Sequence, residues 1–153
     1  MSKKYIVPVV AQTSQNTCWH ASSLMIWYYW QGITSRQGPM NTLSKNYTND
    51  QGVTPQQFVT LAEKAGLKKV SQKYSTYTSA ILEGLLNKYG PLWCAGFWYG
   101  VGHIIVLTGI AGETIYFNDP AGGIQKTNTV SWFSNKISKN IDGCIMYKNP
   151  GAY

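Results

Sequence analysis

The sequence predicts a fold of the α+β class, with helices in the N-terminal half and an antiparallel sheet in the C-terminal half. Between residues 18 and 89, apolar side chains recur at helical spacing, flanked by signals for helix starts and ends. After residue 91, the apolar runs become short, rich in β-branched and aromatic residues, and separated by glycine-bearing breaks, which is typical of strands. A length of 153 residues with 44% apolar residues predicts one globular domain over residues 1–153.

The first helix is expected over residues 18–31, because a polar stretch precedes a long apolar run, and Asn16 or Thr17 could serve as its N-cap. The run is apolar on almost every side, so this helix should be buried at the centre of the protein. Residues 5–10 are expected to be an extended entry segment. Residues 32–52 are rich in Gly, Ser, Asn and Gln, and they are expected to form a long loop that could border a substrate groove.

Two further helices have clear boundary signals. Thr54, Pro55 and Gln57 supply an N-cap, a first-turn proline and a capping box for the second helix, which should end before Gly66. The third helix is expected over residues 79–89, where a Gly-Pro pair ends it.

The antiparallel sheet is expected to contain four strands, at residues 92–98, 103–110, 114–118 and 144–147. A hairpin turn near residues 110–113 should join the second strand to the third. Another cluster of turn-forming residues follows at 119–123, and residues 131–137 are expected to form a short helix.

Charge and hydropathy narrow the classes of function. The net charge of +7 would suit nucleic acid or an anionic surface. However, the basic residues are scattered and Arg36 is the sole arginine, so a solvated basic surface is favoured over nucleic-acid binding. No apolar stretch is long enough to predict a membrane span. The N-terminus carries two lysines without the apolar core of a signal peptide.

The three cysteines are an odd number and widely spaced, which argues against a disulfide framework and fits a reducing compartment. Cys94 and Cys144 lie in apolar strands and are expected to be inert core residues. Cys18 differs, because it opens the first helix. A helix N-terminus presents unpaired N–H groups and a partial positive charge, both of which stabilise a thiolate, so Cys18 is the expected nucleophile.

A nucleophilic cysteine needs a base, and the chain has two histidines. His20 lies two residues after Cys18, so on a helix the two side chains would point about 200° apart. We expect His20 to be a partly exposed residue of the helix or groove. His103 begins a strand after small residues, at a sheet edge where a partner can reach it. His103 is therefore the favoured base.

The base in turn needs a group that fixes its tautomer and supports the imidazolium. The acids after the histidine are Glu113, Asp119 and Asp142. The first and last of these lie in expected turns. Asp119 ends the strand that should pair with the histidine strand, and the intervening hairpin turn would bring it close to His103. Asp119 is the expected orienting group, with neighbouring Asn118, or a purely turn-forming role for Asp119, as the alternatives.

Acyl transfer also needs hydrogen-bond donors aimed at the oxyanion, typically a side-chain amide and a backbone N–H. The Cys18 N–H at the helix start could supply one donor. Gln12, six residues earlier, is expected to supply the other, with Gln15 as a competitor. The alternative is that Gln12 is an ordinary surface residue in a loop.

An ordered pattern spans nearly the whole chain: Gln12, then Cys18-Trp19, then Gly102-His103, then Asn118-Asp119-Pro120. The pattern resembles papain-like cysteine proteases. The closest branches are the peptidase domains of bacteriocin-exporting ABC transporters, which cut leader peptides after a double glycine, and the avirulence effectors of plant-pathogenic bacteria. The resemblance implies catalytic Cys18, His103 and Asp119, an oxyanion hole with Gln12, and no metal or other cofactor. The sequence departs from the effectors at His20, where they commonly carry alanine, and no transporter membrane domain is attached.

By this resemblance, we expect a cysteine endopeptidase that cleaves protein or peptide substrates at or after a Gly-Gly type site. A free-standing enzyme of this type would be a bacterial toxin or effector, cytoplasmic in its producer and delivered by a specialised secretion system into a target cell. A cognate immunity or inhibitor protein is a further expected partner.

The expected groove residues are Trp19, His20, Trp98 and Gly102. The aromatic run just before the base could also line the groove, although alternate members should face the sheet core; it contains Trp93, Phe97, Trp98 and Tyr99.

Three other functions stay open. The same triad could serve another acyl transfer, in an amidase, a deamidase or a transglutaminase. A non-catalytic peptide-binding module is the second, and the presence of Cys18 argues against it. A zinc site from Cys18, His20 and His103 is the third, but Cys-x-His is poor ligand spacing and no fourth ligand is evident.

Overall fold

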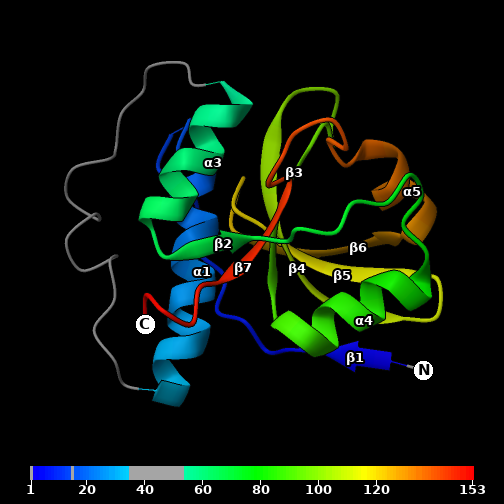
Figure 1. Cartoon of the computed structure of the whole chain (residues 1–153), viewed down its shortest axis with the longest axis horizontal. Coiled ribbons are helices and arrows are strands. Elements are labelled where there is room, and N and C mark those ends of the chain that lie inside the picture. The colour runs from blue at the N-terminus through cyan, green and yellow to red at the C-terminus, as the bar shows by residue number, and fades with distance from the viewer. Residues whose placement is uncertain (1, 15, 35–53) are drawn as a thin grey trace.

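Seven strands form one antiparallel sheet in the part of the chain that the computed structural model describes, which is residues 2–14, 16–34 and 54–153 (Figure 1). In spatial order the strands are β2 (Leu67–Lys69), β7 (Ile145–Lys148), β3 (Leu92–Gly96), β4 (His103–Ala111), β5 (Thr114–Asp119) and β6 (Ile124–Thr129). Strand β1 (Ser2–Lys4) also pairs with β4.

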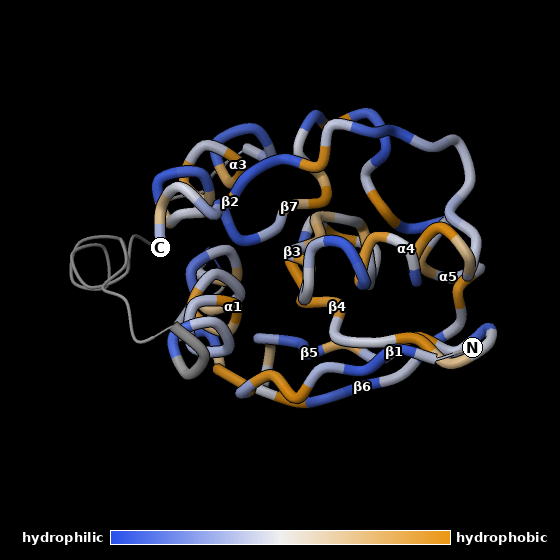
Figure 2. The backbone as a smooth tube through the Cα atoms, turned by 60° about the horizontal axis from the view of Figure 1, so that its bottom comes forward, coloured by the Kyte–Doolittle hydropathy of each residue, from blue (hydrophilic) through white to orange (hydrophobic). Residues whose placement is uncertain are grey.

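Helices cover both sides of this sheet. They are α1 (Cys18–Thr34), α3 (Pro55–Lys64), α4 (Ser79–Tyr89) and α5 (Val130–Lys136). Helix α1 packs against β3, β4 and β7, whereas α4 packs against β4 and β1. Figure 1 shows α1 and α3 on one side of β3 and β4, with α4 and α5 on the other. The hydrophobic stretches of β3 and β4 lie between α1 and α4 (Figure 2). The expected α+β class, with an early helix and a C-terminal antiparallel sheet, is confirmed.

Helix α1 is the buried central helix that its apolar sequence predicts. Met25 and Ile26 are fully buried between the helix and the sheet core. On another side, Trp27 packs against the C-terminal Tyr153, with ring centroids 6.5 Å apart. Burial of this kind contributes about 25 cal/mol for each Å² of apolar surface, so α1 is held by packing rather than by helix propensity.

The helix boundaries follow the local signals closely. The Thr54 side chain accepts the Gln57 N–H, and the Gln57 side chain accepts the Thr54 N–H, so the expected capping box is present. Gly66 has a φ of 90°, a conformation that favours glycine, just after α3 ends. The third expected helix spans its predicted residues 79–89.

Strands at the margins of the sheet differ from expectation. Residues 2–4 form the first strand, and the expected extended segment at 5–10 has no regular structure. Strands β2 and β6 were not expected, because β2 is very short and β6 is a mostly exposed strand without an apolar face. Of the expected loop over residues 32–52, the first three residues belong to α1, and residues 35–52 lie outside the described part.

A β-bulge in β4 decides which side chains share a face across β4 and β5. Thr108 is an extra residue between the paired positions Leu107–Phe117 and Gly109–Tyr116. Beyond the bulge, the register places Asp119 opposite residue 105, and therefore on the same face as His103. In a regular ladder Asp119 would lie opposite residue 106 and point to the other face. The bulge thus brings Asp119 to the histidine side.

Gly96 lies opposite His103 in the β3–β4 ladder and has no room for a side chain. A Cβ atom there would lie 2.6 Å from the Trp98 ring and 2.7 Å from the Lys136 carbonyl oxygen. Trp98 is buried beside Trp132 with ring centroids 5.1 Å apart. The absence of a Cβ at Gly96 therefore allows the buried Trp98 ring to pack directly against β3.

We predict that Gly96→Ala lowers the free energy of unfolding by about 1–3 kcal/mol, because the new methyl group overpacks this core. The matched control is Gly84→Ala, in the exposed middle of α4, where no atom lies within 4 Å of the added Cβ. There the same change should stabilise the protein by about 1 kcal/mol through helix propensity. Urea unfolding measures both values, and equal effects at the two sites would contradict the packing described.

Candidate active site

His103 and Asp119 are joined by a short hydrogen bond. Nε2 of His103 donates to Oδ1 of Asp119 at 2.7 Å, since a carboxylate can only accept. Burial lowers the pKa of His103, but its interactions with Asp119 and Cys18 outweigh this and raise it to about 9. Burial raises the pKa of Asp119, but the hydrogen bonds it accepts prevail and lower it to about 2. The pair is therefore an imidazolium and a carboxylate at neutral pH.

The fully buried Asp119 carboxylate has three donors. Oδ1 accepts His103 Nε2 and also the Ala121 N–H at 2.9 Å, whereas Oδ2 accepts Lys126 Nζ at 2.9 Å. A buried charge is tolerated when it is paired and hydrogen-bonded, and these contacts meet both conditions.

Cys18 begins α1, as the sequence predicts for the nucleophile, and its side chain is only 1% exposed. Its thiol lies close enough to the His103 side chain to interact with it, and this interaction contributes to the raised pKa of the imidazole. Because Asp119 occupies Nε2, the ring nitrogen left for the thiol is Nδ1. The structure therefore brings the three expected residues together in the order thiol, imidazole, carboxylate.

The turn before α1 leaves the first helical N–H groups without a side-chain cap from Thr17. The Thr17 carbonyl accepts the Ala21 N–H, so Thr17 holds the N-cap position by its backbone. Its hydroxyl instead accepts the N–H groups of Thr13 and Ser14 and donates to the Ser14 carbonyl. These three bonds use the full capacity of a hydroxyl. The Thr17 side chain thus stabilises the turn and does not cap the helix at Cys18.

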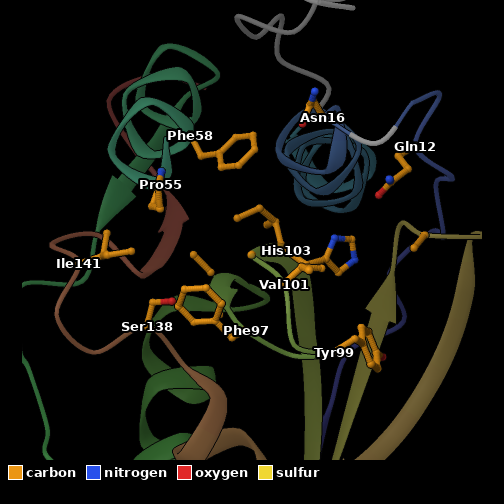
Figure 3. Close-up of a pocket in the computed structure, with 15 residues that line it drawn as sticks. Gln12, Asn16, Pro55, Phe58, Phe97, Tyr99, Val101, His103, Ser138 and Ile141 are labelled. Carbon is orange, nitrogen blue, oxygen red and sulfur yellow. The ribbon is translucent and has the colours of Figure 1, made fainter. Parts of the chain in front are cut away.

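Gln12 lies beside His103, with its amide pointing toward the histidine in Figure 3. The Gln12 N–H donates to the Pro120 carbonyl at 2.8 Å, which ties the segment before α1 to the turn after Asp119. Among the described residues, Gln12 Oε1 is buried and has no hydrogen-bond partner. The Gln12 amide oxygen is therefore an acceptor without a partner beside His103. Its competitor Gln15 lies outside the described residues.

A pocket of about 620 Å³ opens beside His103 (Figure 3). Its polar lining residues include Gln12, Asn16 and His103, and Ser138 lies on the side of Phe97 and Ile141. The apolar part is formed by Pro55 and Phe58 of α3, by Phe97 and Val101 between β3 and β4, and by Ile141. A polar reactive end joined to an apolar chamber suits a peptide whose side chain enters the chamber.

The structure corrects part of the expected groove. Gly102 lines the pocket as expected, but the predictions for Trp19 and Trp98 are wrong, because both side chains are buried in the core. His20 is half-buried, its ring packs against Trp19 with centroids 5.3 Å apart, and it does not line the pocket described here.

The aromatic run before the base alternates as expected. Phe97 and Tyr99 are half exposed and line the pocket, whereas Trp93 and Trp98 are buried.

The two other cysteines are poor candidates for a nucleophile, and the described residues offer no metal site. Cys94 and Cys144 are buried, and burial raises the pKa of both thiols, so they are poor nucleophiles. Among the described residues, no cluster of three or more His, Cys, Asp or Glu side chains could hold a metal ion. In the same residues, no helix has the length and hydropathy needed to cross a bilayer.

Sequence reasoning missed two side chains next to the triad. Lys126 reaches Asp119 from β6, and Tyr99, expected only as a groove residue, accepts a hydrogen bond from Lys126 at 3.3 Å. Lys126 sits in a polar strand that gave no strand signal, so its closeness to Asp119 could not be foreseen.

Comparison with known proteins identifies both family and fold. Residues 1–138 match the family described as papain-like cysteine protease AvrRpt2. Among solved structures, the chain is similar to a double glycine motif protease from an AMS/PCAT transporter, determined in complex with the leader peptide. The TM-score is 0.62 and the identity 21%, over 94% of this chain and 91% of that chain. A comparison with curated proteins gave no match. The resemblance seen in the sequence and the papain-like fold are thus confirmed.

We predict that stability depends on pH through His103. Its pKa rises from 6.5 in the unfolded chain to about 9, so its contribution is fully present below pH 6.5 and is lost as the pH rises through 9. Asp119→Asn should reduce this decline, because the largest of the interactions that raise the pKa of the imidazole is lost. Asp142→Asn is the control, since Asp142 pairs with Lys69 on the surface and should leave the decline intact. Urea unfolding at pH 6.5 and at pH 9 measures the fall in the free energy of unfolding between the two. An unchanged fall in Asp119→Asn would refute the pairing of His103 with Asp119.

Proposed function

The chain belongs to the AvrRpt2 family of papain-like cysteine proteases, and we propose that it is an endopeptidase with Cys18, His103 and Asp119 as its catalytic triad. The observation that carries the proposal is the placement of the Cys18 thiol beside an imidazole that is hydrogen-bonded to the buried Asp119 carboxylate. Each group has the position that its role requires: the thiol at a helix start, the base at a strand start, and the acid behind it.

In the proposed reaction, His103 already holds at Nδ1 the proton given up by Cys18, and the Cys18 thiolate attacks the peptide carbonyl carbon. The S–C bond forms as the carbonyl becomes an oxyanion. The intermediate then collapses, the C–N bond breaks, and the imidazolium gives its proton to the leaving amine. Water next attacks the thioester while neutral His103 takes its proton, and the acid product leaves as the thiolate is restored. Asp119 stays ionised throughout and orients the ring.

Two donors are proposed for the oxyanion. The Cys18 N–H lies at the start of α1, where backbone N–H groups have no partner within the helix. The Gln12 side chain lines the same end of the pocket as His103. A side-chain amide and a backbone N–H are the usual pair for this task in acyl transfer.

The proposed substrate is a protein or peptide with small residues, of a Gly-Gly type, at the scissile bond. The Cys18 side chain is only 1% exposed, so a slender backbone without side chains reaches the sulfur most easily. The similar solved structure is a double glycine motif protease, which supports the same choice. The apolar chamber near Phe58 and Phe97 would receive an apolar side chain near the cleaved bond.

We further propose that the protease acts as a delivered bacterial effector or toxin with a cognate inhibitor. The match to the AvrRpt2 family supports this role, because the sequence pattern resembles avirulence effectors. Production of the enzyme inside a candidate target cell tests it: the wild type should impair growth and Cys18→Ala should not. Equal growth with both would contradict the effector role while leaving the peptidase activity untouched.

We predict that Cys18→Ala abolishes proteolysis without unfolding the protein. Proteomic detection of new protein N-termini in cells producing the wild type should reveal cleavage after Gly-Gly sequences, and none of these N-termini should appear with Cys18→Ala. Cys144→Ala, at a buried cysteine that belongs neither to the proposed triad nor to the pocket lining, should cleave like the wild type. Cleavage that persists in Cys18→Ala would refute the triad.

The same samples separate the other acyl-transfer reactions by mass. A deamidase would add about 1 Da to an intact substrate without new N-termini, a transglutaminase would produce crosslinked species, and a cell-wall amidase would cleave cell-wall material instead of proteins. A peptide-binding module would produce none of these changes.

We predict that Gln12→Ala lowers kcat about 10²–10³-fold with little change in KM, because the amide stabilises the oxyanion more than the bound substrate. The assay uses a peptide that spans one of the cleavage sites identified from the new N-termini. Gln72→Ala is the control, since Gln72 is an exposed residue bonded to Tyr74 and should leave both constants unchanged. A loss of less than about threefold for Gln12→Ala would exclude Gln12 from the oxyanion hole.

A further inference from the structure

The outer oxygen of the Asp119 carboxylate is held by a lysine that the proposed mechanism does not use. Lys126 Nζ lies 2.9 Å from Oδ2, on the side away from His103 and the Ala121 N–H, which both bond Oδ1. Imidazole and ammonium therefore share one fully buried carboxylate. A carboxylate bonded by two cations attracts each of them less strongly than it would attract one alone.

The sheet register places Lys126 at this position. Lys126 lies opposite Phe117 in the β5–β6 ladder, two residues from Asp119 along β5. A diagonal neighbour on the same face is within reach of a long side chain. The lysine thus extends from the edge strand to Asp119 and keeps 36% of its own side chain exposed.

Tyr99 also contacts Lys126. The Lys126 ammonium donates to the Tyr99 hydroxyl at 3.3 Å and lies 4.7 Å from the centre of its ring. The Tyr99 ring is in turn 6.3 Å from the imidazole of His103, centre to centre. Lys126 is therefore held by a hydrogen bond, an ion pair and a cation–π contact, and is not a freely moving surface cation.

We propose that Lys126 is a positioning residue of the triad that limits how tightly Asp119 holds the imidazolium. The proposal rests on the proposed triad. Hydrolysis of the thioester needs a neutral imidazole as base, and a second cation on Asp119 makes the imidazolium proton easier to release. When the imidazole is neutral, the buried Asp119 carboxylate still has a cationic partner in Lys126.

Among the described residues, titratable groups reach His103 from three neighbouring parts of the fold. Cys18 comes from α1, Asp119 from β5 and Tyr99 from the segment between β3 and β4. On the outer side, Lys4 lies over the Tyr116 ring, 4.5 Å from its centre, beside the same shallow surface pocket as Lys126. Lys126 is distinguished from Lys4 by its direct contact with Asp119.

The test is an NMR titration of the histidines in the 153-residue chain, which has two. In Lys126→Met the titration midpoint of His103 should rise by at least about half a pH unit, because a neighbouring positive charge is lost. Lys126→Arg retains the charge and should titrate like the wild type. Lys69→Met removes an equally exposed lysine, at 35%, that pairs with Asp142, and should leave His103 unchanged.

The direction in which the His103 midpoint moves distinguishes an effect of the Lys126 charge from a purely structural role. If Lys126 merely props up the local structure, its loss would weaken the His103–Asp119 bond and the midpoint would fall. A lowered or an unchanged midpoint in Lys126→Met, or failure of Lys126→Arg to restore it, would overturn the proposal. The titration needs no substrate, so absence of Cys18-dependent cleavage would refute the proposed function without affecting this result.

Discussion

The hydrogen bond between His103 Nε2 and Asp119 Oδ1 is the contact on which the rest of the site depends. It leaves Nδ1 for the Cys18 thiol, and it keeps a carboxylate ionised in the protein interior. One feature of the sheet is needed for it: the bulge at Thr108 turns Asp119 to the histidine face. A buried carboxylate without such partners would take up a proton and could no longer support an imidazolium.

The turn before α1 positions the groups that surround the Cys18 thiol. The Thr17 hydroxyl is committed to that turn, so it does not compete for the N–H groups at the helix start. The Gln12 N–H is tied to Pro120, directly after the triad carboxylate. One short segment thereby connects the proposed oxyanion donors to the strand pair that holds the base. This linkage explains how groups far apart in the sequence can keep a fixed geometry around a single carbonyl.

Much of this arrangement was predictable, for identifiable reasons. Two histidines and three downstream acids leave few ways to complete a Cys18 site, and the hairpin brings the His103 and Asp119 positions close together. The face that Asp119 takes depends on the bulge at Thr108, which the sequence did not indicate. Capping and glycine signals predicted α3 and α4 closely. The failures have equally physical causes. Strand β6 lacks an apolar face, so neither the strand nor Lys126 could be predicted, and the buried positions of Trp19 and Trp98 depend on tertiary packing that local pattern does not encode.

The central claim is that Cys18, His103, Asp119 and Gln12 act on one carbonyl group. A crystal structure of the enzyme with a peptide aldehyde ending in Gly-glycinal tests it most directly. We expect the aldehyde carbon bonded to Cys18 Sγ, its oxygen within hydrogen-bonding distance of the Gln12 amide and the Cys18 N–H, and the His103–Asp119 bond intact. An adduct on another residue, or an oxygen that points away from Gln12 and the helix start, would contradict this account.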